Sequence, residues 1–190
     1  MRARTKAHSW AFNEAVVIST LANLFGSEEF PLGRKRYTKL SYLLHRHAEK
    51  NAEGYLKKAA GPYNPKTKYG GSERIAVENG YIREHIAGPY RGFVAAHNIA
   101  QAEGYFRKWY GPDCVQWLEQ LRHKRNDDLE LLATVDMAAE GLRAASRNVN
   151  VDDVKNVILN HQEWKAKLER PIFSDANIAK AIKACQTLFG

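Results

Sequence analysis

The chain has 190 residues, of which 44% are hydrophobic and 26% charged, a composition typical of a folded globular protein and not of a disordered one. No apolar run reaches the length of a membrane span, and the basic start MRARTKAHSW lacks an apolar core, so we expect neither a transmembrane segment nor a secretory signal. The two cysteines, Cys114 and Cys185, fall at apolar positions of helical patterns and predict buried free thiols in a reducing cytoplasm.

The net charge of +8 is unevenly distributed along the chain. Residues 1–70 contain 13 Lys and Arg against 5 Asp and Glu, whereas residues 71–190 contain 16 of each kind. A segregated excess of positive charge produces a directional electrostatic field. The distribution therefore indicates a polyanionic partner, with DNA as the first candidate.

Two predicted helices open the chain. The apolar spacing of WAFNEAVVISTLANLFG predicts a helix over residues 10–25, with Gly26 at its end. A second helix is predicted over residues 32–50. Its apolar face consists of Leu40, Leu43, Leu44 and His47. Two helices joined by a short turn, the second of them basic, favour a helix-turn-helix.

The stretch KKAAGPYNPKTKYGGSERIAVENGYI is dense in Gly, Pro, Tyr and Lys. GYLKKAA is expected to be a short strand or extended segment, and the Gly-Pro, Asn-Pro and Gly-Gly pairs predict no regular structure over residues 61–71. SERIAVENG predicts a short helix that Ser72 caps and Asn79-Gly80 ends. YIREHIAGPYRGFVAAH predicts two strands around a Gly-Pro turn. A helix pair followed by a hairpin is the order of a winged helix, whose wing would span residues 81–95.

The rest of the chain is predicted to be helical. The expected helices span residues 98–110, 112–124, 127–147, 152–161 and 175–188. Asp152 and Ser174 are the expected N-caps of the last two. The predicted fold class is mainly α: a basic, winged-helix-like part with a small β-hairpin over residues 1–96, packed on a C-terminal helical bundle over residues 97–190.

Few residues are candidates for catalysis or metal binding. The seven histidines are scattered, and His45 and His47, two positions apart on a helix, point in directions too different to share a metal. Acidic pairs open two predicted helices, where they stabilise the positive end of the helix dipole. We find no spaced acidic array of the kind a nuclease needs, and no phosphate-binding or dinucleotide motif. We therefore expect no metal, no cofactor and no enzymatic activity.

Basic and aromatic side chains alternate in the first third of the chain. The candidate nucleic-acid contacts are Arg34, Lys35, Arg36, Lys39, Arg46, Lys57, Lys58, Lys66, Lys68 and Tyr69. Lys and Arg neutralise phosphates, and Tyr can donate a hydrogen bond to them or stack on bases. The alternatives are a solvated basic face and a docking surface for an acidic protein.

Two parts of the chain carry a resemblance to a known family. The first holds Lys39, Leu40, Tyr42 and Leu43, then the Ala-Ala-Gly-Pro-Tyr turn at residues 59–63 and the Asn-Gly-Tyr stop at residues 79–81. The second is VDDVKNVILNHQEWKAKLERPIFSDANIAKAIKACQTL, with its Trp-x-x-K segment. Together they resemble the accessory C-terminal domain of type I restriction–modification specificity subunits. The Gly-Pro turn is more distantly similar to the Panacea antitoxin domains.

The resemblance implies a bacterial, cytoplasmic, non-enzymatic module of a restriction–modification or phage-defence system. Its basic third would contact DNA, mostly through the backbone phosphates, and its bundle would contact another protein subunit, with no membrane involved. The alternative is an antitoxin-like module that docks an acidic protein without DNA. The pattern contains no catalytic residues, so it implies none here.

Overall fold

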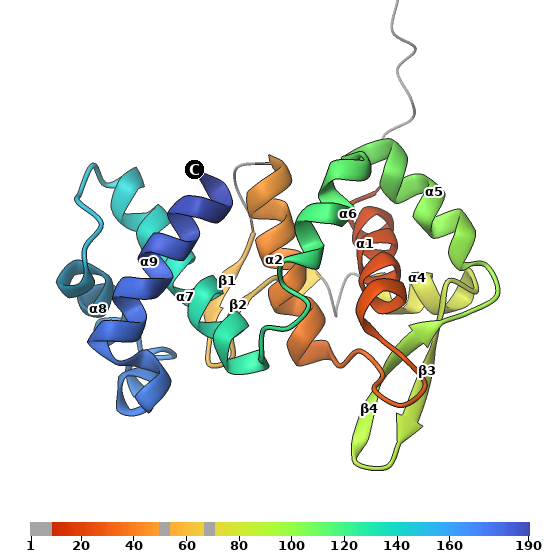
Figure 1. Ribbon diagram of the computed structural model, residues 1–190, viewed down its shortest axis with the longest axis horizontal. Helices are drawn as coiled ribbons and strands as arrows, with labels where there is room; N and C mark the ends of the chain where they lie inside the picture. The colour runs from red at the N-terminus through yellow and green to blue at the C-terminus, as the bar shows by residue number, and fades with distance from the viewer. Residues whose placement is uncertain (1–8, 50–53, 67–70) are drawn as a thin grey trace, which may run out of the picture. The chain divides into compact units, whose positions relative to one another are not determined.

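The computed structural model describes residues 9–49, 54–66 and 71–190 (Figure 1). The chain forms two compact units and passes between them: unit 1 comprises residues 1–37 and 65–116, and unit 2 comprises residues 38–64 and 117–190. This division differs from the one predicted after residue 96. The predicted mainly α fold with a small β-hairpin is confirmed. No described helix is both long enough and apolar enough to cross a lipid bilayer.

The central helix of unit 1 is α1, Trp10–Phe25, whose bounds match the prediction. The Ser9 hydroxyl caps it by accepting the Phe12 N–H at 3.2 Å, and residues 15–22 are all buried. Helices α4, Ser72–Glu78, and α5, Ile99–Tyr110, pack against it. The N-cap of α4 is Gly71 in a left-handed conformation, so the prediction of Ser72 as the cap is wrong.

The predicted wing is present in unit 1 as the antiparallel strands β3, Ile82–Ala87, and β4, Tyr90–Ala95. A two-residue turn joins them, and its first residue, Gly88, has a φ of 57°, which glycine adopts without strain. Figure 1 shows this hairpin extending beyond the helices of unit 1. Its length past the helices leaves the side chains near the turn exposed to solvent.

A third extended segment pairs with the far edge of β4. The Leu32 N–H donates to the Phe93 carbonyl and the Phe93 N–H donates to the Leu32 carbonyl, both at 2.9 Å. Helix α2, Arg34–Glu49, begins two residues later. The order in unit 1 is therefore α1, the bridging residue Leu32, the first turn of α2, α4 and the hairpin.

Two glycines allow this close approach of the Leu32 segment to β4. A Cβ atom on Gly92 would lie 2.4 Å from the Leu32 carbonyl carbon and oxygen. A Cβ atom on Gly26 would lie 2.8 Å from the Phe93 carbonyl oxygen. Both distances are too short for any side chain, so these positions need glycine for a steric reason.

Unit 2 is built around α7, Asn126–Ala144, against which α8, Val151–Leu159, and α9, Asp175–Phe189, both pack. Two 3-10 helices, η1 at Lys165–Glu169 and η2 at Pro171–Phe173, connect α8 to α9. The prediction of Ser174 as an N-cap is confirmed, because its hydroxyl accepts the Asn177 N–H.

Three boundary predictions are wrong, the first being the end of α7, which the structure places at Ala144 and not at residue 147. The residue that caps α8 is Asn150, whose side chain accepts the Asp153 N–H at 2.8 Å, and not Asp152. Helix α6 is Pro112–Glu119 and ends before Lys124, because residues 120–123 form turns.

The Ala-Ala-Gly-Pro segment forms a second hairpin, in unit 2. Strands β1, Leu56–Lys58, and β2, Gly61–Tyr63, pair antiparallel, with Lys57 opposite Pro62. Proline is tolerated because a two-stranded sheet leaves one edge of each strand without ladder bonds. The prediction of no regular structure over residues 61–71 is therefore wrong at 61–63, and also at 65–66, which are helical; residues 67–70 lie outside the described part.

The Trp-x-x-K segment holds this hairpin in place. The Trp164 Nε1 donates to the Lys58 carbonyl at 2.9 Å, and the Lys167 ammonium donates to the Ala59 carbonyl and pairs with Glu130. Trp164 and Lys167 are both buried. The Ala-Ala-Gly-Pro turn and the Trp-x-x-K segment, which both carry the family resemblance, thus contact each other. These contacts stabilise the fold of unit 2.

Candidate nucleic-acid interface

The first turn of α2 presents three predicted basic residues in unit 1. Arg34 donates from Nε and Nη2 to the two carboxylate oxygens of Glu73 on α4, at 2.6 and 2.7 Å. The Tyr37 hydroxyl donates to the same carboxylate, and its ring packs against Phe93 on β4. Hydrogen bonding to Glu73 raises the pKa of Arg34, which keeps its charge. These contacts join the start of α2 to α4 and to the wing.

The neighbours of Arg34 differ in their exposure. Lys35 is exposed, whereas Arg36 is half-buried and burial lowers its pKa. Lys66 is exposed as well, and its Nζ lies 6.0 Å from the centre of the Trp10 ring. Of the predicted contacts, Arg34, Lys35 and Lys66 therefore present charge to solvent in unit 1.

Two further arginines of unit 1 belong to this surface, and the sequence interpretation missed both. Arg74 on α4 has a side chain 75% exposed, and Arg91 on β4 has one 70% exposed. The start of α2 lies beside β4 at Arg91, since a Cβ on Gly33 would be 3.5 Å from the Arg91 carbonyl oxygen. We define the basic surface of unit 1 as Arg34, Lys35, Arg74 and Arg91.

A sequence signal for these two arginines did exist. Arg74 lies in the short helix directly before the hairpin, SERIAVENG, which the sequence predicted. Arg91 follows the Gly-Pro turn of the wing itself. The prediction omitted both arginines because the count of charges over residues 71–190 is balanced, and such a count hides local clusters.

Carboxylates are interspersed with the basic surface. Glu73 pairs with Arg34, Glu78 lies 4.0 Å from Arg74, and Glu84 lies 3.4 Å from Arg91. The Arg74–Glu78 and Arg91–Glu84 pairs are exposed, so they are weak and screened by salt, and a phosphate can compete with them. The Arg34–Glu73 pair is bidentate and its carboxylate is largely buried. The surface is therefore mixed in charge, and its attraction for a polyanion is moderate.

Four predicted contacts lie in unit 2 instead. Lys39 is buried. Lys57 is half-buried, with its Nζ 5.3 Å from the centre of the Trp164 ring, and burial lowers its pKa. Lys58 is exposed and its Nζ lies 3.3 Å from Glu163. The remaining one is Arg46. Lys68 and Tyr69 lie outside the described residues.

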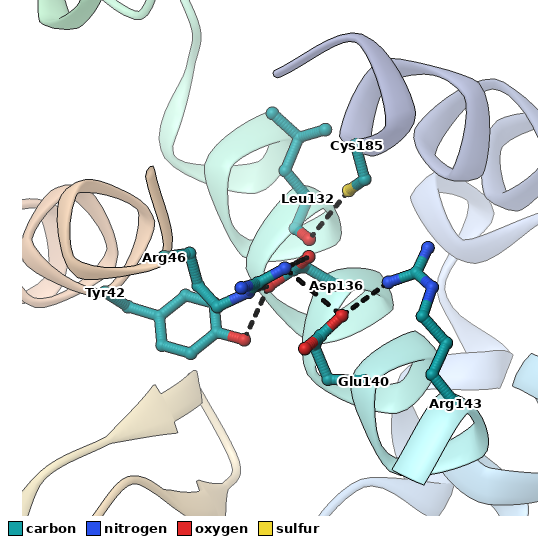
Figure 2. A network of polar contacts seen from close by, with 7 residues as sticks. All are labelled: Tyr42, Arg46, Leu132, Asp136, Glu140, Arg143 and Cys185. Carbon is teal, nitrogen blue, oxygen red and sulfur yellow. Dashed lines mark hydrogen bonds and ion pairs between the residues drawn. The ribbon is translucent and has the colours of Figure 1, made fainter. Parts of the chain in front are cut away.

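Arg46 is the centre of a buried polar network in unit 2 (Figure 2). Its Nε donates to Asp136 Oδ2 at 2.7 Å and its Nη2 to Oδ1 at 3.3 Å, while the Tyr42 hydroxyl donates to Oδ2 at 2.7 Å. Its Nη2 also lies 3.2 Å from Glu140, which in turn accepts from Arg143 at 2.5 Å. Arg46 therefore forms a buried ion pair with Asp136 and does not present its charge to DNA, so its prediction as a nucleic-acid contact is wrong.

Burial dominates the electrostatics of this network. It raises the pKa of Asp136, although hydrogen bonds from Arg46 and Tyr42 act in the opposite direction. Burial also raises the pKa of the Cys185 thiol to about 12, and the thiol donates to the Leu132 carbonyl at 3.7 Å. A thiol held protonated in this way is a poor nucleophile. Cys114 and Cys185 are both free and buried, as predicted.

Within the described ranges, no group of three or more His, Cys, Asp or Glu side chains is placed to hold a metal ion. Comparisons of the chain with known protein families, with curated proteins and with solved structures find no match.

Proposed function

We propose that unit 1 binds duplex DNA through its backbone phosphates, and that the protein is a non-enzymatic binding module of a bacterial restriction–modification or phage-defence system. The observation that carries the DNA part is the winged-helix order of unit 1 together with exposed cations on three elements of that fold. The assignment to a restriction–modification or phage-defence system rests on the family resemblance. In the same proposal, the helices of unit 2 contact a partner subunit.

The geometry supports a continuous contact with DNA. The Arg34–Glu73 pair joins α2 to α4, and the Leu32–Phe93 bridge joins the start of α2 to the wing. Winged helices bring a recognition helix and a wing to the same duplex. Arg74 lies on the helix at the recognition position, and Arg91 lies on the wing. Both cations therefore belong to elements that approach DNA in this class of fold.

The mixed charge of the basic surface limits the expected affinity for duplex DNA. Four cations that each displace one counterion give a log–log salt slope of about −3 to −4. Non-specific binding of this kind has dissociation constants on the order of 10⁻⁴ to 10⁻⁶ M at physiological salt. The proposal therefore concerns moderate binding with little sequence preference.

Charge reversal tests which surface is used. Fluorescence anisotropy with a labelled duplex should show Lys35→Glu and Arg74→Glu each weakening binding about 10-fold, since each change replaces an attraction with a repulsion. Lys165→Glu is the matched control, because it makes the same change in net charge at an exposed position of η1 in unit 2. Equal losses in all three variants, or no binding by the unaltered protein at low salt, would reject the proposal.

A second candidate function is favoured by exposed apolar side chains on the wing and on the connector between α1 and α2. Phe30 and Tyr90 are 53% and 51% exposed and pack edge to face at 5.3 Å, and Ile86 is 65% exposed. Exposed aromatic residues with a charged rim are typical of protein-binding surfaces. An antitoxin-like module that docks an acidic protein would use them. Its binding would weaken strongly when Tyr90 is replaced by Ser, a change that alters no cation of the basic surface and should leave DNA affinity nearly the same.

A further inference from the structure

The joint between α4 and the wing contains the single Asn-Gly pair of the chain, Asn79–Gly80. Asparagine loses its side-chain amide most readily when glycine follows it, since glycine has no Cβ to shield its backbone nitrogen. Asn79 is exposed at the end of α4, whereas Gly80 is buried. The carboxamide that reacts is therefore open to water, while the nitrogen that must attack it is not.

This deamidation is intramolecular and needs no reagent other than water. The backbone nitrogen of Gly80 loses its proton and bonds to the side-chain carbonyl carbon of Asn79. The bond from that carbon to Nδ2 then breaks and ammonia leaves. Water opens the resulting cyclic imide at either of its carbonyl groups, which gives aspartate or isoaspartate. Because the Gly80 nitrogen has to approach the Asn79 side chain, the peptide group between them must be free to rotate.

Hydrogen bonds hold this peptide group on both sides. The Gly80 N–H donates to the Val77 carbonyl at 3.0 Å, and Asn79 Nδ2 donates to the Ile75 carbonyl at 2.8 Å. The Asn79 backbone carbonyl accepts from Asn98 Nδ2 at 3.0 Å, and the Gly80 carbonyl accepts the Asn98 N–H at 2.8 Å. Both reacting groups are therefore engaged elsewhere while the joint is closed.

The start of α5 completes the joint. Asn98 is at the N-cap position of α5, but within the described residues its side chain makes no capping bond to that helix and bonds to Asn79 instead. The neighbouring turn is tightly packed, since a Cβ on Gly80 would lie 2.5 Å from His97 Cε1. Opening of the joint must therefore separate α4 from the start of α5.

We propose that Asn79 is a site of spontaneous deamidation that the folded unit 1 suppresses, so that the modification forms only when the joint between α4, the wing and α5 opens. The product cannot close the joint again in the same way. Aspartate has no donor for the Ile75 carbonyl, and its negative charge lies at the carboxyl end of α4, where the helix dipole disfavours it. Isoaspartate lengthens the backbone within the turn. The change is therefore irreversible, and it is independent of the proposed DNA binding.

Peptide mapping by mass spectrometry tests the site. The protein is incubated in mildly alkaline buffer, folded or unfolded in guanidinium chloride, and deamidation is followed in the tryptic peptide IAVENGYIR, residues 75–83. The rate in the folded protein should be at least about 10-fold lower than in the unfolded protein, because opening has to precede the reaction. A folded rate within about 2-fold of the unfolded rate would overturn the proposal.

Asn160 provides an internal comparison for the chemistry. It ends α8 with φ −82° and ψ −2°, close to the −78° and −4° of Asn79, but His161 and not glycine follows it. In the unfolded protein Asn160 should react at least about 5-fold more slowly than Asn79, since the histidine side chain shields the attacking nitrogen. Equal rates at the two positions in guanidinium chloride would overturn the assignment of Asn79 as the reactive residue.

One variant and a matched control test the contacts of the joint. Asn98→Ala removes the hydrogen bond to the Asn79 carbonyl, so it should raise the folded rate about 2- to 5-fold and leave the unfolded rate the same. Gln101→Ala makes a similar change at an exposed position in the first turn of α5 and should alter neither rate. If the two variants deamidate equally fast when folded, the joint does not control the reaction and the proposal is wrong.

Discussion

Replacing Arg46 tests whether this residue stabilises unit 2 from within. Its side chain is 6% exposed and that of Asp136 is 0% exposed. Removing one partner of a buried ion pair leaves the other charge without compensation, at a cost of about 3–5 kcal/mol. Arg46→Ala should therefore lower the free energy of unfolding by that amount. It should have almost no effect on DNA affinity.

Two further substitutions divide this cost between the contacts. Tyr42→Phe removes one hydrogen bond to Asp136 and should cost about 1–2 kcal/mol. The double change Arg46→Met with Asp136→Leu removes both charges, so it should cost much less than the sum of the two single changes.

Urea unfolding followed by circular dichroism measures these differences, with an unchanged dependence on urea showing that the unfolded state is the same. A change at Arg46 that costs less than about 1 kcal/mol would refute the reasoning, because an exposed arginine behaves in that way. A large loss of DNA affinity at unchanged stability would contradict it as well. Arg46 would then belong to the surface, as the sequence alone indicated.

Three other results are expected. Gly92→Ala should separate the Leu32 segment from β4, since the new Cβ would lie 2.4 Å from the Leu32 carbonyl. Hydrogen exchange of the Leu32 and Phe93 amides should then become faster, while exchange in α9 stays the same. Burial alone would raise the pKa of Glu130, but the bonds from Lys167 and Arg170 outweigh burial and lower this pKa. The stabilisation from Glu130 is therefore complete above about pH 4.5 and is lost as pH falls through the folded-state pKa. Glu130→Gln should flatten the acid limb of a stability–pH curve, and an unchanged limb would contradict this account. Repurified protein should leave supercoiled plasmid intact with Mg²⁺, Mn²⁺ or Zn²⁺, and nicking that survives repurification would disprove the non-enzymatic assignment.

The sequence predicted the elements whose signals are local. Apolar periodicity placed α1 with its observed bounds, and the Gly-Pro turn placed the wing, because both patterns depend only on neighbouring residues. The Ala-Ala-Gly-Pro segment was harder. GYLKKAA indicated the first strand, Leu56–Lys58, but not its partner Gly61–Tyr63. The hairpin is held by Trp164 and Lys167, which lie about a hundred positions away in the chain, so no local pattern could indicate the second strand.

The candidate site divides in the same way. The first turn of α2 was identified correctly as basic and exposed at Lys35, since a helix start is a local feature. Arg46 and Lys39 were placed with it because they share the helix and the charge. Their burial depends on residues far away, such as Asp136 on α7, and net charge cannot distinguish a buried paired arginine from an exposed one.

The salt dependence of DNA binding tests the proposed function most directly. Affinity for a mixed-sequence duplex should fall along a log–log slope of about −3 to −4, and Arg74→Ala should reduce the slope by roughly one while the melting temperature stays the same. A slope near zero would contradict DNA binding through phosphates and would move the function of unit 1 to a protein partner at the wing. A steep slope that Arg74→Ala leaves unchanged would contradict the assignment of α4 as a contact with DNA.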